Sequence, residues 1–172
     1  KTAFPESGTE SKPESVVKGS VLEYVLKITN PDKELEMTDI ILEDVFSNTM
    51  KFNNTIKVQI GNGNKIPISQ AARISSYSVK DEGNKTVFTA SISSLAPEEN
   101  LAIILPVTVT DEIGTPIDNV ARVKSINGVE YNIESNGTHH IVSDCKVKIL
   151  KVDGQGKPLK GAVLQILDED KN

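Results

Sequence analysis

The sequence has little of what catalytic and metal-binding sites usually require. Its 172 residues include one cysteine, Cys145, and two histidines, His139 and His140. A single cysteine cannot form an internal disulfide. Adjacent histidines on a strand point to opposite faces, so they cannot bind one ion together. We therefore expect no metal, no cofactor and no histidine-based catalysis. Cys145 has no histidine partner in a plausible pattern, and we expect it to be inert or to form dimers by accident in vitro.

Aromatic residues, positive charge and long apolar runs are also scarce. Aromatics make up 4% of the chain and tryptophan is absent, so sites that stack sugars or bases are poorly supplied. Lysine and arginine number 19 against 24 acidic residues, a net charge of −5, which argues against nucleic-acid binding. No run approaches the ~18 apolar residues of a membrane helix, and no signal peptide opens the chain. We expect no direct membrane insertion.

Most of the chain alternates apolar and polar residues with the period of β-strands. Segments of this kind, rich in Val, Ile and Thr, are separated by turn residues, and Asn127-Gly128 is a strong hairpin signal. The pattern predicts an all-β fold, an antiparallel β-sandwich. The expected strands are 21–30, 38–46, 55–60, 73–80, 86–93, 101–110, 117–126 and 129–142, preceded by an extended arm over 1–20.

The alternation also predicts a core and a domain boundary. We place the sandwich at residues 1–142 and a junction with the start of a second β domain at 143–172. That remainder is below the ~40 residues an unaided core needs, so we expect that it cannot form a sandwich alone. The residues expected inside the sandwich are Leu22, Tyr24, Leu26, Ile40, Leu42, Phe88, Ile92, Ile103, Leu105, Val107, Ala121 and Val123.

Two polar residues occupy positions where the alternation predicts core. Asp44 shares a face with Leu42 and Phe46, and Asn119 shares a face with Ile117 and Ala121. A buried carboxyl or amide without a partner is costly, so each demands one. One interpretation is that Asp44 caps a strand end and Asn119 bonds to backbone at a bulge. The other is that both act with a lysine.

A lysine amine can attack an asparagine carboxamide, expel ammonia and leave an amide crosslink. Burial favours this reaction because it lowers the pKa of the amine and raises the pKa of a nearby carboxyl, which can then polarise the amide. Fixed proximity adds a large effective molarity. The constellation requires one lysine, one acid and one asparagine on three strands of a single core.

Several stretches resemble isopeptide-forming, immunoglobulin-like domains of Gram-positive pilins and cell-wall-anchored adhesins. They are the arm with its following strand, Asp39-Ile-Ile-Leu-Glu-Asp44, Leu95-Ala-Pro-Glu-Glu99 and Asp118-Asn-Val-Ala-Arg-Val123. The resemblance implies that Lys1 and Asn119 form the crosslink and that Asp44 promotes it. Lys12 and Lys18 are the alternative lysines, although Lys18, in a Lys-Gly turn, fits solvent better.

The end of the chain resembles the first two strands of a B-type repeat domain of collagen adhesins and pilins. The matching elements are Lys151-Val-Asp153, Pro158-Leu-Lys-Gly-Ala162 and the alternation Leu164-Gln-Ile166. In such domains the lysine at the position of Lys151 bonds to an asparagine on the last strand. That strand lies outside this sequence, so the resemblance implies that Lys151 has no partner here.

These features together predict a structural function. We expect a stalk or pilin module of an extracellular, cell-wall-associated surface protein, with self-directed, single-turnover chemistry and no enzymatic activity. Neighbouring domains of the same protein or pilus are the expected partners. By the resemblance, a secretion signal and a sortase anchor lie outside the sequence. The alternative is an adhesin domain that binds a host matrix protein such as collagen, for which Tyr77 and Tyr131 are the candidate exposed aromatics.

Overall fold

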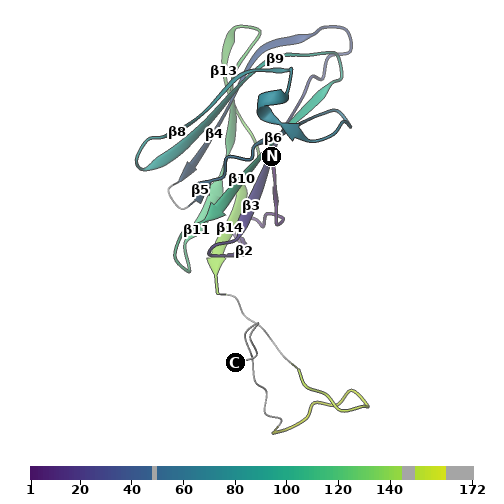
Figure 1. Ribbon diagram of the computed structural model, residues 1–172, viewed down its shortest axis with the longest axis vertical. Coiled ribbons are helices and arrows are strands. Elements are labelled where there is room, and N and C mark those ends of the chain that lie inside the picture. The colour runs from purple at the N-terminus through teal and green to yellow at the C-terminus, as the bar shows by residue number, and fades with distance from the viewer. Residues whose placement is uncertain (48–49, 145–149, 162–172) are drawn as a thin grey trace.

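The computed structural model describes residues 1–47, 50–144 and 150–161, and within them the protein is built from β-strands (Figure 1). One short 3-10 helix, Ile68–Gln70, interrupts them. The strands are β1 (Thr2–Phe4), β2 (Glu14–Val17), β3 (Val21–Thr29), β4 (Met37–Ser47), β5 (Met50–Phe52), β6 (Lys57–Ile60), β7 (Ile66–Pro67), β8 (Ile74–Asp81), β9 (Lys85–Leu95), β10 (Asn100–Val109), β11 (Pro116–Asn119), β12 (Ala121–Ile126), β13 (Val129–Glu134) and β14 (Thr138–Ser143).

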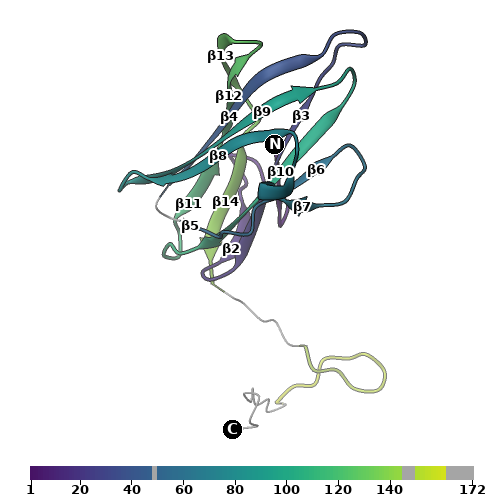
Figure 2. The same cartoon turned by 45° about the horizontal axis from the view of Figure 1, so that its top comes forward.

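The strands form two large sheets and one small one. The first large sheet has the order β1-β3-β10-β6-β7, with β5 also paired to β10, and the second has the order β13-β12-β4-β9-β8. The small sheet, β11-β14-β2, lies at the end of the sandwich from which β14 leads to the rest of the chain (Figures 1 and 2). The predicted all-β, immunoglobulin-like sandwich is confirmed. Its pairs are antiparallel except β14–β2, which is parallel.

The core lies between the two large sheets, and aromatic rings join their inner faces. Tyr24 on β3 meets Phe46 on β4 with ring centroids 5.5 Å apart, and Phe52 on β5 stacks on Phe88 of β9 at 6.2 Å. Of the residues expected inside, all are buried except Val123, which is only partly buried. Val123 lies on β12, next to the edge strand β13, and lines a pocket together with Ile28 and Ile133.

Two of the expected strands are each divided in two. The expected strand 117–126 breaks at Val120 into β11 and β12, and the expected strand 129–142 breaks at Ser135–Gly137 into β13 and β14. At Val120 the chain passes from the small sheet to the five-stranded sheet, and at Ser135–Gly137 it passes back. Alternation continues through Val120 without a change of phase, which is why the sequence pattern predicts continuous strands.

The amino-terminal arm is more ordered than expected. Residues 2–4 form β1, which pairs antiparallel with β3, and residues 14–17 form β2, which pairs with β14. Between them, Gly8 donates a backbone hydrogen bond to the carbonyl of His139. The arm therefore belongs to two sheets and holds Lys1 against the sandwich.

The segment beyond the sandwich is described only in part. Val152 forms an isolated bridge with Pro158, and the backbone turns between them. Much of the expected second domain lies outside the described residues, and so does Cys145.

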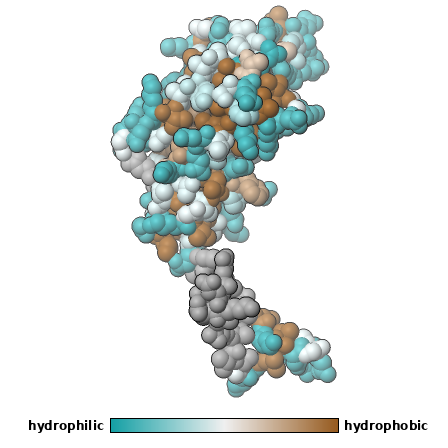
Figure 3. All heavy atoms as spheres, in the orientation of Figure 1, coloured by the Kyte–Doolittle hydropathy of each residue, from teal (hydrophilic) through white to brown (hydrophobic). Residues whose placement is uncertain are grey.

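Figure 3 shows one face of the molecule, on which a band of apolar residues crosses the upper half of the sandwich.

Candidate functional site

Lys1 and Asp44 form a buried ion pair between the two large sheets. The Lys1 ammonium donates to both carboxylate oxygens of Asp44, at 2.9 Å to Oδ1 and 2.8 Å to Oδ2. The two side chains are 1% and 0% exposed. The Lys1 Nζ also lies 4.6 Å from the ring centroid of Tyr24 and 5.6 Å from that of Phe46. The pair is thus enclosed by aromatic surface rather than by water.

Strand pairing brings the acid and the asparagine close together, although they lie on strands of two different sheets. Asp44 on β4 lies opposite Ala121 on β12, and Asn119 ends β11 two residues earlier in the chain. Asn119 is in turn opposite Thr138 on β14, whose hydroxyl donates to the Asn119 carbonyl at 3.2 Å. The sheet change at Val120 therefore places Asn119 beside Asp44, at the junction of the two sheets.

Asn119 is buried without an ordinary hydrogen bond for its side chain. The residue is 3% exposed, and among described residues neither its Nδ2 nor its Oδ1 has a partner of standard length and angle. The carboxamide is nevertheless close enough to Asp44 to favour the ionised carboxylate. A buried amide without a well-formed hydrogen bond is costly, so Asp44 is the group on which this side chain depends.

Burial shifts both members of the ion pair toward neutrality. It lowers the pKa of the Lys1 side chain from 10.5 to about 8, although attraction and hydrogen bonding by Asp44 oppose the shift. Burial likewise raises the pKa of the Asp44 carboxyl above its ordinary value, against the opposing effects of Lys1 and Asn119. Both directions have the same cause, the loss of water around a charge. Burial therefore makes the neutral amine and the protonated acid less costly to form from the ion pair than they are in water.

The other lysines considered from the sequence lie elsewhere. Lys12 is exposed, and Lys18 forms a surface ion pair with Glu112. Lys151 is also exposed. The structure thus brings together Lys1, Asp44 and Asn119, the three residues that the motif match assigns to the crosslink, and leaves the competing lysines at the surface.

The two histidines have separate environments, as their adjacent positions on a strand predict. The Nδ1 of His139 lies 2.8 Å from Oδ1 of the exposed Asp118. His140 is fully buried, and its Nε2 lies 3.3 Å from the Pro5 carbonyl. Neither ring takes part in the Lys1 cluster.

Sequence reasoning missed the residue that holds Lys1 in place. The side chain of Asn136, in the break between β13 and β14, bonds to the backbone of Lys1. The two residues are 135 positions apart, and the sequence carries no signal that would join them. Alternation predicts the rings around Lys1 only as core positions, because it indicates burial and not which group a ring faces.

No helix among the described residues is long and apolar enough to cross a membrane. Neither a protein-family model nor a curated protein sequence matches this chain.

Solved structures of Gram-positive pilins share the fold. The major pilin subunit of Bacillus cereus is 18% identical, with a TM-score of 0.51 over 76% of this chain and 38% of the pilin. Domains D2 and D3 of the major pilin SpaD from Corynebacterium diphtheriae are 17% identical, with a TM-score of 0.51 over 72% and 47%. A C-terminal fragment of the major pilin GBS80 of Streptococcus agalactiae is 12% identical, with a TM-score of 0.51 over 84% and 56%.

These similarities confirm the resemblance to pilin immunoglobulin-like domains at the level of the fold. The chain spans between 38% and 56% of the length of the three pilin structures. At this level of identity a shared fold does not establish a shared function.

Proposed function

We propose that the chain is a structural module, a stalk or pilin domain of a bacterial cell-surface protein, which stabilises itself with an amide bond between Lys1 and Asn119. The observation that carries the proposal is the buried contact of Lys1 Nζ with Asp44, beside a buried Asn119 carboxamide that has no hydrogen bond of standard length and angle. The pilin fold supports the cell-surface role. The chemistry occurs once per molecule and is not enzymatic turnover.

The reaction joins two side chains and releases ammonia. The neutral Lys1 amine attacks Cγ of Asn119, and the protonated Asp44 carboxyl donates a hydrogen bond to Oδ1 as negative charge develops there. Asp44 then relays a proton from Nζ to Nδ2, the Cγ–Nδ2 bond breaks, and ammonia leaves. The new bond is Nζ–Cγ, and Asp44 ends in the protonation state in which it began. No co-reactant is needed.

The site supplies the three conditions that this reaction lacks in water. Burial favours the neutral amine and the protonated acid. The fold holds the acid against the amine before reaction, which replaces a random encounter with a fixed one. The aromatic walls limit water, which strengthens the interaction of Asp44 with the developing charge.

A covalent link suits an extracellular protein that cannot form an internal disulfide. The chain has one cysteine, whereas small extracellular domains are commonly stapled by disulfides. A Lys1–Asn119 amide would join the first strand region to a late strand and would resist extension of everything between them. Neighbouring domains of the same surface protein or pilus are the proposed partners.

The exposed tyrosines do not favour the matrix-binding alternative. Tyr77 lies on β8 and Tyr131 on β13, which are the two opposite edge strands of the five-stranded sheet. They cannot line one groove together. An adhesin site built on exposed aromatics would require them on neighbouring strands.

Tandem mass spectrometry of a tryptic digest tests the proposal. We expect a branched peptide in which the segment that begins with Lys1 is joined to the segment that contains Asn119. The branched peptide should be absent from Asn119→Ala and present in Asn132→Ala, a control at an exposed asparagine of β13. Unbranched peptides in the unsubstituted chain would refute the crosslink.

A further inference from the structure

Strand β3 is paired along both edges for only part of its length. One edge pairs with β10 from Val21 to Thr29. The other edge pairs with β1 only from Glu23 to Val25. Among the described residues, no strand continues this pairing beyond Val25. The segment 27–29 therefore forms an open sheet edge, and open edges are templates for further strands.

The hydrogen-bond directions within the sheet show which groups of β3 face this open edge. Pro106 of β10 has no N–H, and its carbonyl accepts a bond from Asn53 at 3.0 Å, on the side away from β3. Glu23, which lies opposite Pro106, therefore directs its N–H and C=O toward β1. Every second residue of an antiparallel strand faces the same edge. Lys27 accordingly directs its N–H and C=O into the open edge.

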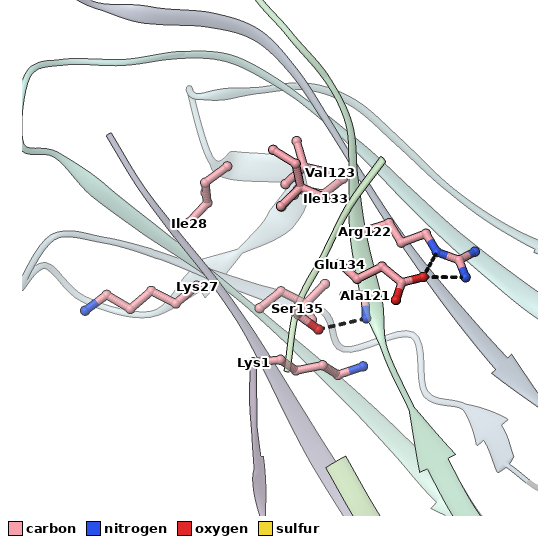
Figure 4. A pocket seen from close by; sticks show the side chains of 11 residues that line it. Lys1, Lys27, Ile28, Ala121, Arg122, Val123, Ile133, Glu134 and Ser135 are labelled. Atoms are coloured by element: carbon pink, nitrogen blue, oxygen red, sulfur yellow. Dashed lines mark hydrogen bonds and ion pairs between the residues drawn. The ribbon is translucent and has the colours of Figure 1, made fainter. Parts of the chain in front are cut away.

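An apolar cavity of about 200 Å³ lies beside this edge, between the two large sheets, with Lys1 at its border. Figure 4 shows Ile28 of β3 together with Val123 and Ile133 of the second sheet on one side of Lys1. Leu26, Leu42 and Ala121 complete the apolar lining. We call this cavity, with the open edge at 27–29, the β3 slot.

The strand that borders the slot carries apolar side chains that nothing described covers. On β13, Val129 is 55% exposed, Tyr131 46% and Ile133 51%. Ile133 pairs with Val123, which pairs with the buried Leu42, so Ile133 belongs to the inner face of its sheet. Among the described residues, no strand of the opposite layer covers this part of the inner face.

We propose that the β3 slot receives an extended segment joined to the amino end of Lys1, which lengthens β1 along β3. Continuity with the existing β1–β3 pairing supports this occupant. Both the backbone N and the backbone O of Lys1 bond to Asn136, at 2.7 Å each, and so face away from β3. In an antiparallel pair the residue before Lys1 would then face β3 and pair with Lys27. The strand direction leads straight into the slot.

The register also specifies the side chains that the occupant requires. Thr2 lies opposite Val25, so Lys1 lies opposite Leu26, and the second residue before Lys1 would lie opposite Ile28. That second residue shares the inward face of Lys1 and Ala3. It should therefore be apolar, whereas the first and third residues before Lys1 should tolerate polar groups. The proposal is independent of the crosslink.

Two extensions of equal composition test this assignment on the full chain. One adds Thr-Val-Thr before Lys1, which places valine opposite Ile28, and the other adds Thr-Thr-Val, which turns valine outward. We expect the first to raise the melting temperature by about 3 °C or more above both the second extension and the unextended chain. It should also slow hydrogen exchange of the Lys27 amide. Ile133→Ser should remove most of this gain.

Two results would overturn the proposal. One is equal melting temperatures for both extensions, with Lys27 exchanging as in the unextended chain. The other is a concentration-dependent dimer of the unextended chain in which the Lys27 amide is already protected, since that would assign the slot to a second copy. The proposal is supported if the Thr-Val-Thr extension protects the Lys27 amide from hydrogen exchange while size-exclusion chromatography shows that the protein is a monomer.

Discussion

The carboxamide of Asn136 bonds to the backbone of Lys1 at two points. Its Oδ1 accepts from the Lys1 nitrogen and its Nδ2 donates to the Lys1 carbonyl, each at 2.7 Å. Because Asn136 lies in the break between β13 and β14, this contact ties the start of the chain to the place where the sheets change. The direction in which the Lys1 side chain enters the core therefore depends on Asn136.

Replacing this asparagine should slow the crosslink without removing any reacting group. In Asn136→Ala the Lys1 backbone loses both bonds, so the amine spends less time against Asp44. We expect a lower crosslinked fraction at early times after folding, measured by intact mass, and an unchanged pH profile. Asn132→Ala, at an exposed β13 position, should react like the unsubstituted chain. Equal time courses for the two variants would show that Asn136 does not position Lys1.

Removing only one partner of the Lys1–Asp44 ion pair should reduce the free energy of unfolding more than removing both partners. In an Asn119→Ala background, which cannot crosslink, Asp44→Ala leaves the Lys1 amine buried without a counter-charge. We expect this change to reduce the free energy of unfolding in urea by about 3–5 kcal/mol. Replacing both partners, with Lys1→Met and Asp44→Leu, should restore most of the loss because no charge then remains to be buried.

An exposed ion pair provides the control for that series. Arg122 and Glu134 are paired at 2.9 Å at the surface, with side chains 41% and 51% exposed. Glu134→Gln should therefore cost less than about 1 kcal/mol. A loss for Asp44→Ala no larger than this would mean that the Lys1–Asp44 pair is not held in the core in solution.

The rate of crosslinking should be flat near neutral pH and should fall on both sides. The ion pair and the neutral pair hold the same single proton, so their ratio does not change with pH while that proton is retained. Above about 8, the pKa to which burial lowers Lys1, the pair loses its proton and Asp44 can no longer donate one. At acidic pH the carboxylate is protonated while the lysine remains an ammonium, which is not a nucleophile.

A photocaged lysine at position 1 allows this profile to be measured in the folded chain. Light releases the amine at a chosen pH, and the loss of ammonia is followed by mass. A rate that keeps rising well above pH 8 would show that the reaction needs only a free amine and no proton from Asp44.

Mechanical extension should reveal where the crosslink lies. With Lys1 joined to Asn119, force applied between the chain ends passes directly to residue 119, so that only residues 120–143 of the sandwich can extend, by ~80 Å at most. In Asn119→Ala the whole of residues 2–143 should extend, by ~480 Å. Single-molecule force spectroscopy distinguishes these lengths. A full-length extension of the unsubstituted chain would contradict a Lys1–Asn119 link.

Much of the sandwich could be predicted because burial in strands follows a period of two. Asp44 and Asn119 lie at the core positions that alternation assigns to them. Asn127 and Gly128 have φ values of +52° and +74°, as a tight hairpin turn with both central residues left-handed requires. Each of these features depends on a few residues that are neighbours in the sequence, so a local sequence pattern is enough to predict it.

The features of the fold and of the site that the sequence does not predict depend on contacts between distant parts of the chain. The strand break at Val120 preserves alternation and so leaves no trace in the hydrophobic pattern. The assignment of Lys1 came from resemblance to a family, and no feature of its own neighbourhood in the sequence distinguishes it from Lys12. The Asn136 contact and the β3 slot arise only when the sheets are assembled.

The intact mass of the folded, unsubstituted chain tests the central claim most directly. We predict a mass lower than the sequence mass by one ammonia, and the full sequence mass for Asn119→Ala after correction for the substitution. The same full mass is expected for Asp44→Ala, which keeps both crosslinking residues. An unsubstituted chain with its full sequence mass would contradict the crosslink and would leave Lys1, Asp44 and Asn119 as a buried polar cluster only.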